Sequence, residues 1–189
     1  MLPARATLRG QAMVEFAVIL LPVLLIVVGL IQFGLLFGAN VTLTNAAREG
    51  ARAGTVYVYD HSRSRTWNDA ERCGAILAAA RGSMGFLTTS APNFSTTLNP
   101  DGSCPTPSGE TQVNGDLTVS YCASVNTPDA PCPDTSDPGT ACLVDTREDC
   151  LVRVTLRYGS AIIVPFMGQI LGSGSGLFVQ SATVTMVIN

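Results

Sequence analysis

The pattern of apolar positions begins with one long, unbroken block near the N-terminus. Between Phe16 and Ala39 the only strongly polar side chain is Gln32. The block is ~24 residues long, or ~36 Å as a helix, which is enough to cross a hydrocarbon core of ~30 Å. It therefore predicts a transmembrane helix, which we expect to continue in more polar sequence to about residue 53.

Beyond this block, apolar residues recur at the shorter periods of a small mixed domain. Residues 55–59 are expected to be extended, and residues 68–81 are expected to form an amphipathic helix. Thr66 or Asn68 would cap that helix and Gly82 would end it. Alternating apolar residues predict strands beginning at residues 117, 151 and 177. The fold class is α+β, with a short helix and an antiparallel sheet of three to four strands after the long helix.

Composition and charge exclude several kinds of function. The 189-residue chain has a net charge of −3, and its eleven basic residues are all arginine. A slightly acidic chain without a basic cluster is a poor nucleic-acid binder, so no nucleic-acid partner is expected. His61 is the only histidine, and no nucleophile elbow, P-loop or dinucleotide fingerprint occurs. We therefore expect no enzymatic activity, no cofactor and no metal.

Six cysteines follow the apolar block, and none forms a C-x-x-C pair. An even number of cysteines in a loop-rich region favours disulfides and an oxidising compartment. The C-terminal part is therefore expected outside the cytoplasm, with a disulfide-rich loop over about 122–150. The connectivity stays open, and one natural set of pairs is Cys122 with Cys150, Cys132 with Cys142, and Cys73 with Cys104. Strand parity argues against the first pair, because Cys122 falls on a polar face and Cys150 on an apolar one; a bulge would be needed to join them.

The loop between the first two strong strands, residues 126–149, is acidic, and Arg147 alone opposes its negative charge. Its acidic residues are Asp129, Asp134, Asp137, Asp145, Glu148 and Asp149. Carboxylates are calcium ligands, but the regular spacing of a calcium loop is missing. A surface loop held by disulfides is the preferred interpretation.

Small residues mark two parts of the long helix. Gly34 and Gly38 form a G-x-x-x-G pair, which permits close helix approach, although glycines are common in membrane helices. Further along, a face of Ala47, Gly50, Ala51 and Gly54 has little bulk, while Arg48 and Arg52 share another face. This small face suits packing against a sheet or another subunit; a solvated helix end is the alternative.

The residues just before the apolar block carry a more specific signal. Gly10 is followed by Gln11 and then, five positions after the glycine, by Glu15-Phe16. A carboxylate at the edge of a membrane span is costly unless it snorkels, is protonated or finds a partner. A plain signal anchor does not account for this acid, and an incidental edge charge is the alternative. This arrangement resembles a type IVb prepilin cleavage site. The segment Asn45–Gly54, with its sequence AAREGAR that includes Glu49, resembles the TadE-like minor pilins, or pseudopilins, of the tight-adherence (Flp pilus) system.

This resemblance implies processing and assembly. A prepilin peptidase would cut after Gly10, so that residues 1–10 are a cytoplasmic leader and the mature chain begins at Gln11. The new amine of Gln11 would pair with Glu15 of an adjacent subunit in the filament. Residues 11–54 would form the long helix, spanning the inner membrane at about 16–39, and residues 55–189 the extracytoplasmic pilin-like domain. The expected partners are other pilin subunits and the tight-adherence assembly machinery.

The resemblance thus implies a minor pilin or pseudopilin that contributes to the assembly, the initiation or the tip of an adhesive surface pilus. An alternative from a different class is a permanently membrane-anchored binding or scaffold protein that never enters a filament. The mature N-terminus separates the two. A chain that begins at Gln11 indicates the pilin, whereas a chain that retains Met1 indicates the scaffold.

Overall fold

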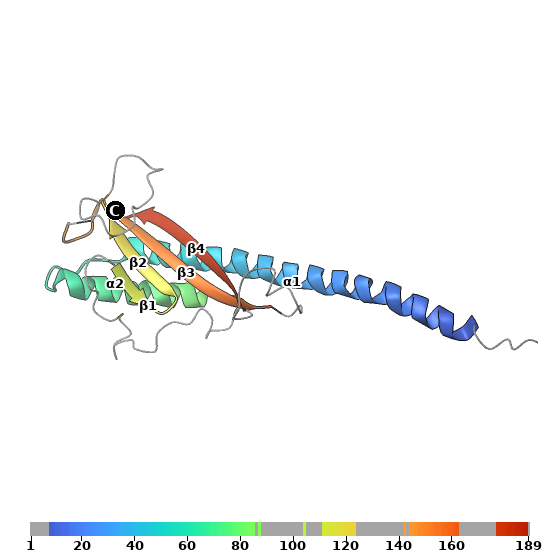
Figure 1. Ribbon diagram of the computed structural model, residues 1–189. Helices are drawn as coiled ribbons and strands as arrows, with labels where there is room; N and C mark the ends of the chain where they lie inside the picture. The colour runs from blue at the N-terminus through green and yellow to red at the C-terminus, as the bar shows by residue number, and fades with distance from the viewer. Residues whose placement is uncertain are drawn as a thin grey trace, which may run out of the picture. The chain divides into compact units, whose positions relative to one another are not determined.

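The computed structural model describes residues 8–85, 87, 104, 111–123, 142, 144–162 and 177–188, with side chains at all of these except 8–11 and 111–114. These residues form two helices and four strands (Figure 1). They are α1 (Leu8–Val56), α2 (Arg65–Gly82), β1 (Thr111–Asn114), β2 (Leu117–Cys122), β3 (Leu151–Ala161) and β4 (Leu177–Val187). The predicted α+β class is confirmed.

Helix α1 is 49 residues long and continues through Pro22. It ends at Val56, so the prediction of an extended piece from residue 55 is wrong for its first two residues. The hydroxyl of Thr55 donates a 2.8 Å hydrogen bond to the carbonyl of Arg52, which occupies an acceptor in the last helical turn.

The connection from α1 to α2 is held by polar side chains. Ser64, and not Thr66 or Asn68 as predicted, caps α2 by accepting a hydrogen bond from the Trp67 amide at 3.3 Å. Asn68 is fully buried inside the helix instead. Its Oδ1 accepts from the Asp60 amide and the Tyr57 hydroxyl, and its Nδ2 donates to the Asp60 and Ser64 carbonyls. One buried amide therefore fixes the turn, with all its hydrogen-bonding capacity used.

The four strands form one sheet in the order β1-β2-β3-β4. β2 pairs antiparallel with both β1 and β3. Across β3 and β4, the hydroxyls of Thr155 and Thr183 lie 3.0 Å apart, and Ser160 donates to Gln180 at 3.3 Å. The numbers of these partners run in opposite directions, so this pair is antiparallel too. β1 was not predicted, because its sequence TQVN holds only one apolar residue.

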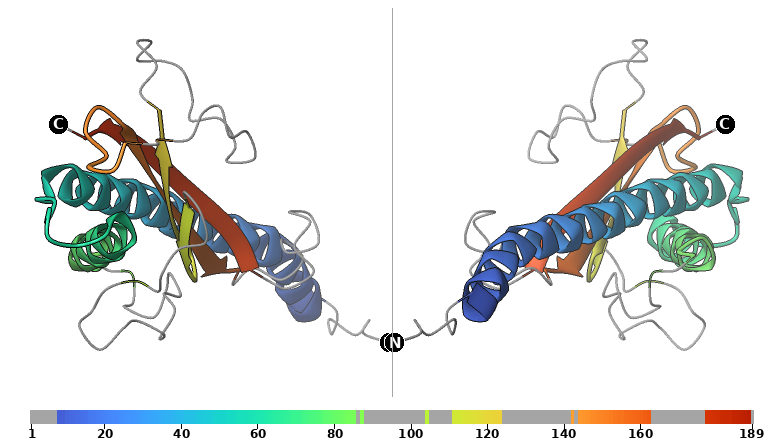
Figure 2. Two further views of the ribbon diagram at one scale, coloured as in Figure 1. Left: turned by 90° about the vertical axis from the view of Figure 1, so that its left-hand side faces the viewer. Right: turned by 90° about the vertical axis from the view of Figure 1, so that its right-hand side faces the viewer.

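The core of the domain lies between this sheet and two helical segments, the C-terminal part of α1 and α2 (Figure 2). The predicted alternation is confirmed: Leu117, Val119 and Tyr121 of β2 are buried, as are Val152, Val154 and Leu156 of β3. In α2 the predicted face of Ile76, Leu77 and Ala80 is buried as well. From α1 the core receives mainly small side chains: Ala39, Leu43, Ala46, Ala47 and Ala51.

The disulfides differ in part from the predicted pairing. Cys73 is joined to Cys104, as expected. Cys142 is joined to Cys150, so the pairs of Cys122 with Cys150 and Cys132 with Cys142 are wrong. In the sheet, Cys122 lies opposite Leu151 rather than Cys150, which agrees with the parity argument against that pair. Cys122 is itself disulfide-bonded, but Cys132 lies outside the described residues.

The chain divides into two compact units. One contains residues 39–160 and 179–189, and the other contains residues 1–38 and 161–178. Within the second unit, Gln32 is almost completely buried and donates a 3.2 Å hydrogen bond to the Ala161 carbonyl. The one strongly polar side chain of the apolar block thus has a polar partner 129 residues away.

Candidate functional site

The predicted processing residues lie at the very start of α1. The helix begins at Leu8, so the backbone of Gly10 and Gln11 belongs to its first turn. The peptide bond between Gly10 and Gln11 thus lies in the first turn of α1 that the structure describes.

Glu15 and Phe16 lie one to two turns further along α1, and their side chains are exposed. Phe16 is 66% exposed, and most large apolar side chains between Met13 and Phe37 are exposed as well. The most apolar stretch of this helix has a mean hydropathy of 2.9 and no buried residue, and by length and composition it can cross a membrane. Apolar surface of this extent requires a lipid or protein environment.

The two glycine groups of α1 have different surroundings. No atom outside the helix backbone lies within 4 Å of the position that a Cβ at Gly34 would occupy. A Cβ at Gly50 would lie 3.3 Å from the carbonyl oxygen of Ile76, and one at Gly54 would lie 2.9 Å from the Cδ1 of Ile76. The second group therefore packs against α2 within the domain. A packing role for Gly34 and Gly38 between helices stays a prediction.

The charged residues of the same segment face outward. Arg48, Glu49 and Arg52 are exposed, whereas Ala47 and Ala51 are completely buried. The C-terminal part of α1 thus places its small residues in the core and its charged residues on an exposed face.

A buried ionic cluster, formed by Asp69, Arg72, Tyr121 and Arg147, was not predicted. Arg72 and Arg147 are each 1% exposed and Asp69 is 2% exposed. Arg147 donates from Nη2 to Asp69 Oδ2 at 2.7 Å and from Nε to Oδ1 at 3.4 Å. It also donates to the Cys142 carbonyl, beside the Cys142–Cys150 disulfide. The cluster therefore connects α2 to the turn that precedes β3.

Tyr121 provides the aromatic surface of this cluster. The Arg147 guanidinium carbon lies 4.4 Å from the centre of its ring, and that of Arg72 lies 5.6 Å away. Contacts of this kind stabilise a desolvated cation. Burial raises the pKa of the Tyr121 phenol far above its usual 10.0, and the Asp69 carboxylate raises it further, while both guanidinium groups act in the opposite direction. The phenol therefore stays neutral over the whole physiological range.

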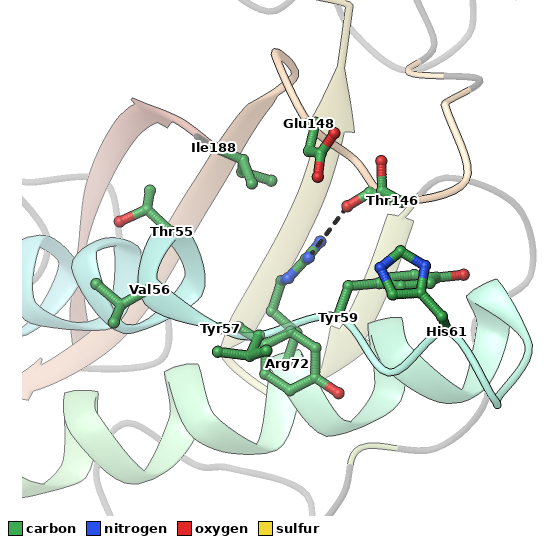
Figure 3. A pocket seen from close by; sticks show the side chains of 10 residues that line it. Thr55, Val56, Tyr57, Tyr59, His61, Arg72, Thr146, Glu148 and Ile188 are labelled. Carbon is green, nitrogen blue, oxygen red and sulfur yellow. Dashed lines mark hydrogen bonds between the residues drawn. The ribbon is translucent and has the colours of Figure 1, made fainter.

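A pocket of about 380 Å³ opens beside the cluster. It is lined by the end of α1, residues 57–59 and His61, and by Arg72, Thr146, Glu148 and Ile188 (Figure 3). His61 is exposed and stacks edge-on against Tyr59, with ring centres 5.2 Å apart. Within the described residues, no group of three or more histidine, cysteine or acidic side chains is arranged to hold a metal ion.

Comparison with protein families gives one finding. A model described as TadE-like protein matches residues 10–52. This segment of the chain is TadE-like. Comparison with curated proteins gave no match, and comparison with solved structures gave none either.

The TadE-like segment coincides with most of α1 and contains the residues predicted for processing and assembly and, except for Gly54, those predicted for helix packing. It extends from Gly10 to Arg52, and so from the exposed apolar part of the helix into the part that packs in the domain. The buried cluster and the pocket lie beyond it. The sequence did not indicate them, because Asp69 and Arg72 occur in an amphipathic helix without a recognisable motif, and Arg147, the partner of Asp69, lies in an acidic loop.

Proposed function

We propose that this protein is a minor pilin or pseudopilin of a tight-adherence pilus. It contributes to the assembly, the initiation or the tip of this adhesive filament. The proposal is supported by the TadE-like segment, since that family is associated with pili of this system. It is also supported by the exposed apolar surface of α1, which fits first a membrane and then a bundle of similar helices. The function is structural, and no catalytic step is assigned to any residue.

The observation that carries the proposal is the position of Glu15. This acid is exposed on α1, four residues after Gln11 and directly before the long apolar block. A carboxylate in hydrocarbon or in an apolar bundle is costly unless a positive group compensates it. Cleavage after Gly10 by a prepilin peptidase would create an amine on Gln11, and an axial stagger between neighbouring subunits would bring that amine to Glu15. Two groups that are each costly alone would then stabilise the assembly.

The proposed topology follows from the same assignment. Residues 1–10 are the cytoplasmic leader, residues 11–54 form the stem helix, and residues 55–189 form the domain on the outer side of the bacterial inner membrane. The disulfides Cys73–Cys104 and Cys142–Cys150 support this orientation, because disulfides persist in oxidising compartments. After assembly the same domain would belong to the surface pilus.

Substitution of Glu15 tests the proposal. Glu15→Leu is expected to leave membrane insertion and leader removal intact but to reduce incorporation into sheared pili at least tenfold, and Glu15→Gln, which keeps the size without the charge, is expected to act in the same way. Met13→Leu, an apolar exchange two residues away on the same exposed helix, is the matched control. Normal incorporation of both Glu15 variants would remove the pairing.

A further inference from the structure

The pocket beside the ionic cluster has a buried cation in its wall. Arg72 reaches the pocket from α2, and Thr55, Tyr57, Tyr59 and Glu148 lie around it (Figure 3). All residues that line the pocket belong to one compact unit of the chain. The site is therefore built within a single folded domain.

Arg72 is only 1% exposed, and part of its hydrogen-bonding capacity is not used by the described residues. Its Nη2 donates to the Thr146 carbonyl at 3.5 Å, which is a long bond. Its Nε and Nη1 have no hydrogen-bond partner among the described residues. A guanidinium has five N–H groups in a planar fork, and buried donors without acceptors are costly. Arg72 thus places in the wall of the pocket a guanidinium whose buried Nε–H and Nη1–H groups lack acceptors among the described residues.

The charge of Arg72 is also poorly compensated. Asp69 is the shared anion of two guanidinium groups, but its carboxylate lies 2.7 Å from Arg147 and 3.8 Å from Arg72. The guanidinium carbon of Arg72 lies 5.0 Å from the ring centre of Tyr57 and 5.6 Å from that of Tyr121. Such contacts stabilise the positive charge but do not neutralise it. Among the described residues the buried cluster holds two cations and one anion, and Arg72 is the cation that lies farther from that anion.

We propose that this pocket binds a carboxylate carried on a small apolar group, with Arg72 as the anchor. A guanidinium fork matches a carboxylate in geometry and charge. At the rim, Val56 is 71% exposed and Val58 is 85% exposed, so an apolar group attached to the carboxylate would cover both. The exposed Glu148 at the same pocket disfavours a dianion such as phosphate. A volume of about 380 Å³ is in the ordinary range for a small ligand.

A free carboxylic acid and the C-terminal residue of a peptide share this chemistry. The proposal goes beyond the pilin assignment and does not depend on it, because binding is measured on the domain and not on filaments. Glu148 supplies the competing arrangement, in which its own carboxylate turns inward and occupies Arg72. The Glu148→Gln variant removes that competitor and keeps its size.

The test uses the full chain in detergent micelles, labelled with ¹⁵N-arginine and observed through the arginine Nε–H signals. The probes are N-acetyl-leucine, its uncharged amide N-acetyl-leucinamide, acetate, and the peptide Ala-Ala-Leu with a free C-terminus. N-acetyl-leucine is expected to bind saturably and shift the Arg72 signal, with at least tenfold weaker binding of the amide and of acetate. Arg72→Gln should abolish this binding, whereas Arg65→Gln, a change at an arginine outside the pocket, should not.

The acid and amide are compared on the unaltered chain, so the result does not depend on the folding of Arg72→Gln. Tighter binding of the peptide than of N-acetyl-leucine would assign the site to a protein C-terminus, and the reverse would assign it to a free acid. Equal affinity for acid and amide, absence of saturable binding, unchanged binding by a folded Arg72→Gln variant, or binding that occurs only in Glu148→Gln would each overturn the proposal.

Discussion

Arg147 donates two hydrogen bonds to the carboxylate of Asp69, which lies 78 residues earlier in the chain, and both side chains are almost fully buried. The pair joins the first turns of α2 to the segment that leads into β3. A buried pair is weak evidence of net stabilisation, but removal of one partner leaves an uncompensated charge in the core. In this cluster the loss of Asp69 would remove the carboxylate that accepts both of these hydrogen bonds and lies 3.8 Å from the second buried guanidinium, that of Arg72.

Asp69→Asn and Arg147→Met are therefore each expected to lower the free energy of unfolding by about 3–5 kcal/mol. The measurement is chemical denaturation of the full chain in detergent, followed by far-UV circular dichroism. Asp145→Asn is the matched control, because Asp145 pairs with Arg65 at 3.8 Å at the surface and its side chain is 84% exposed. That change is expected to cost less than about 1 kcal/mol. Equal effects of the buried and surface changes would contradict the role given to the cluster.

The contact between Gly54 and Ile76 gives a prediction about packing. A Cβ at Gly54 would lie 2.9 Å from Cδ1 and 3.1 Å from Cγ1 of Ile76, which is fully buried and has little room to move. Gly54→Ala is expected to destabilise the domain by about 1–3 kcal/mol, partly offset by the better helix propensity of alanine.

Gly82→Ala is the control for propensity alone, because nothing lies within 4 Å of a Cβ at that position. It is expected to leave the thermal midpoint unchanged or slightly higher. The double variant Gly54→Ala/Ile76→Val should recover part of the lost stability, since it shortens the side chain that the new methyl group meets. Full stability of Gly54→Ala alone would show that the two helices do not approach this closely.

The buried phenol of Tyr121 predicts a loss of stability at alkaline pH. Its pKa is raised above the usual 10.0 in the folded state, chiefly by burial. In the unfolded chain the phenol ionises near pH 10, whereas in the folded chain it keeps its proton. The contribution to stability is therefore fully present below pH 10 and is lost as the pH rises above that value, with a slope of up to about 1.4 kcal/mol per pH unit.

Denaturation midpoints measured from pH 8 to 11 test this dependence. Tyr121→Phe should flatten the decline, and Tyr158→Phe, at a tyrosine that lies at the edge of the core, should not. Tyr57 also has a raised pKa, mainly from burial and then from Glu71, so a smaller decline is expected to remain in Tyr121→Phe. A decline of the same steepness in the wild type and in Tyr121→Phe would exclude Tyr121 as its source.

Much of the fold could be predicted from local patterns. β2 and β3 pack one face on the core, so their burial repeats every second residue and is visible in the sequence as Leu117, Val119 and Tyr121 or Val152, Val154 and Leu156. The small-residue face of α1 was visible for a similar reason, because close packing of two helices requires side chains with little bulk. The apolar block was visible from its length and composition, which are those of a helix that can cross a membrane.

The parts that could not be predicted depend on distant partners. Arg147 looked like a surface cation among acidic residues, and only the fold brings Asp69 and Tyr121 to it. Gln32 looked like an isolated polar residue, and its acceptor is the carbonyl of Ala161. The sequence does not single out Ser64 as the cap of α2, because several nearby polar residues would fit a cap equally well and only the backbone geometry decides between them.

Cleavage between Gly10 and Gln11 is the central claim of the pilin assignment, since the pairing of Glu15 requires the amine that cleavage creates. The most direct measurement is mass spectrometry of the N-terminal peptide of the protein purified from membranes and pili of its native host. The account predicts a chain that begins at Gln11, as a free or cyclised glutamine. A chain that retains Met1 and residues 2–10 in both fractions would contradict it and would indicate a permanently anchored protein instead.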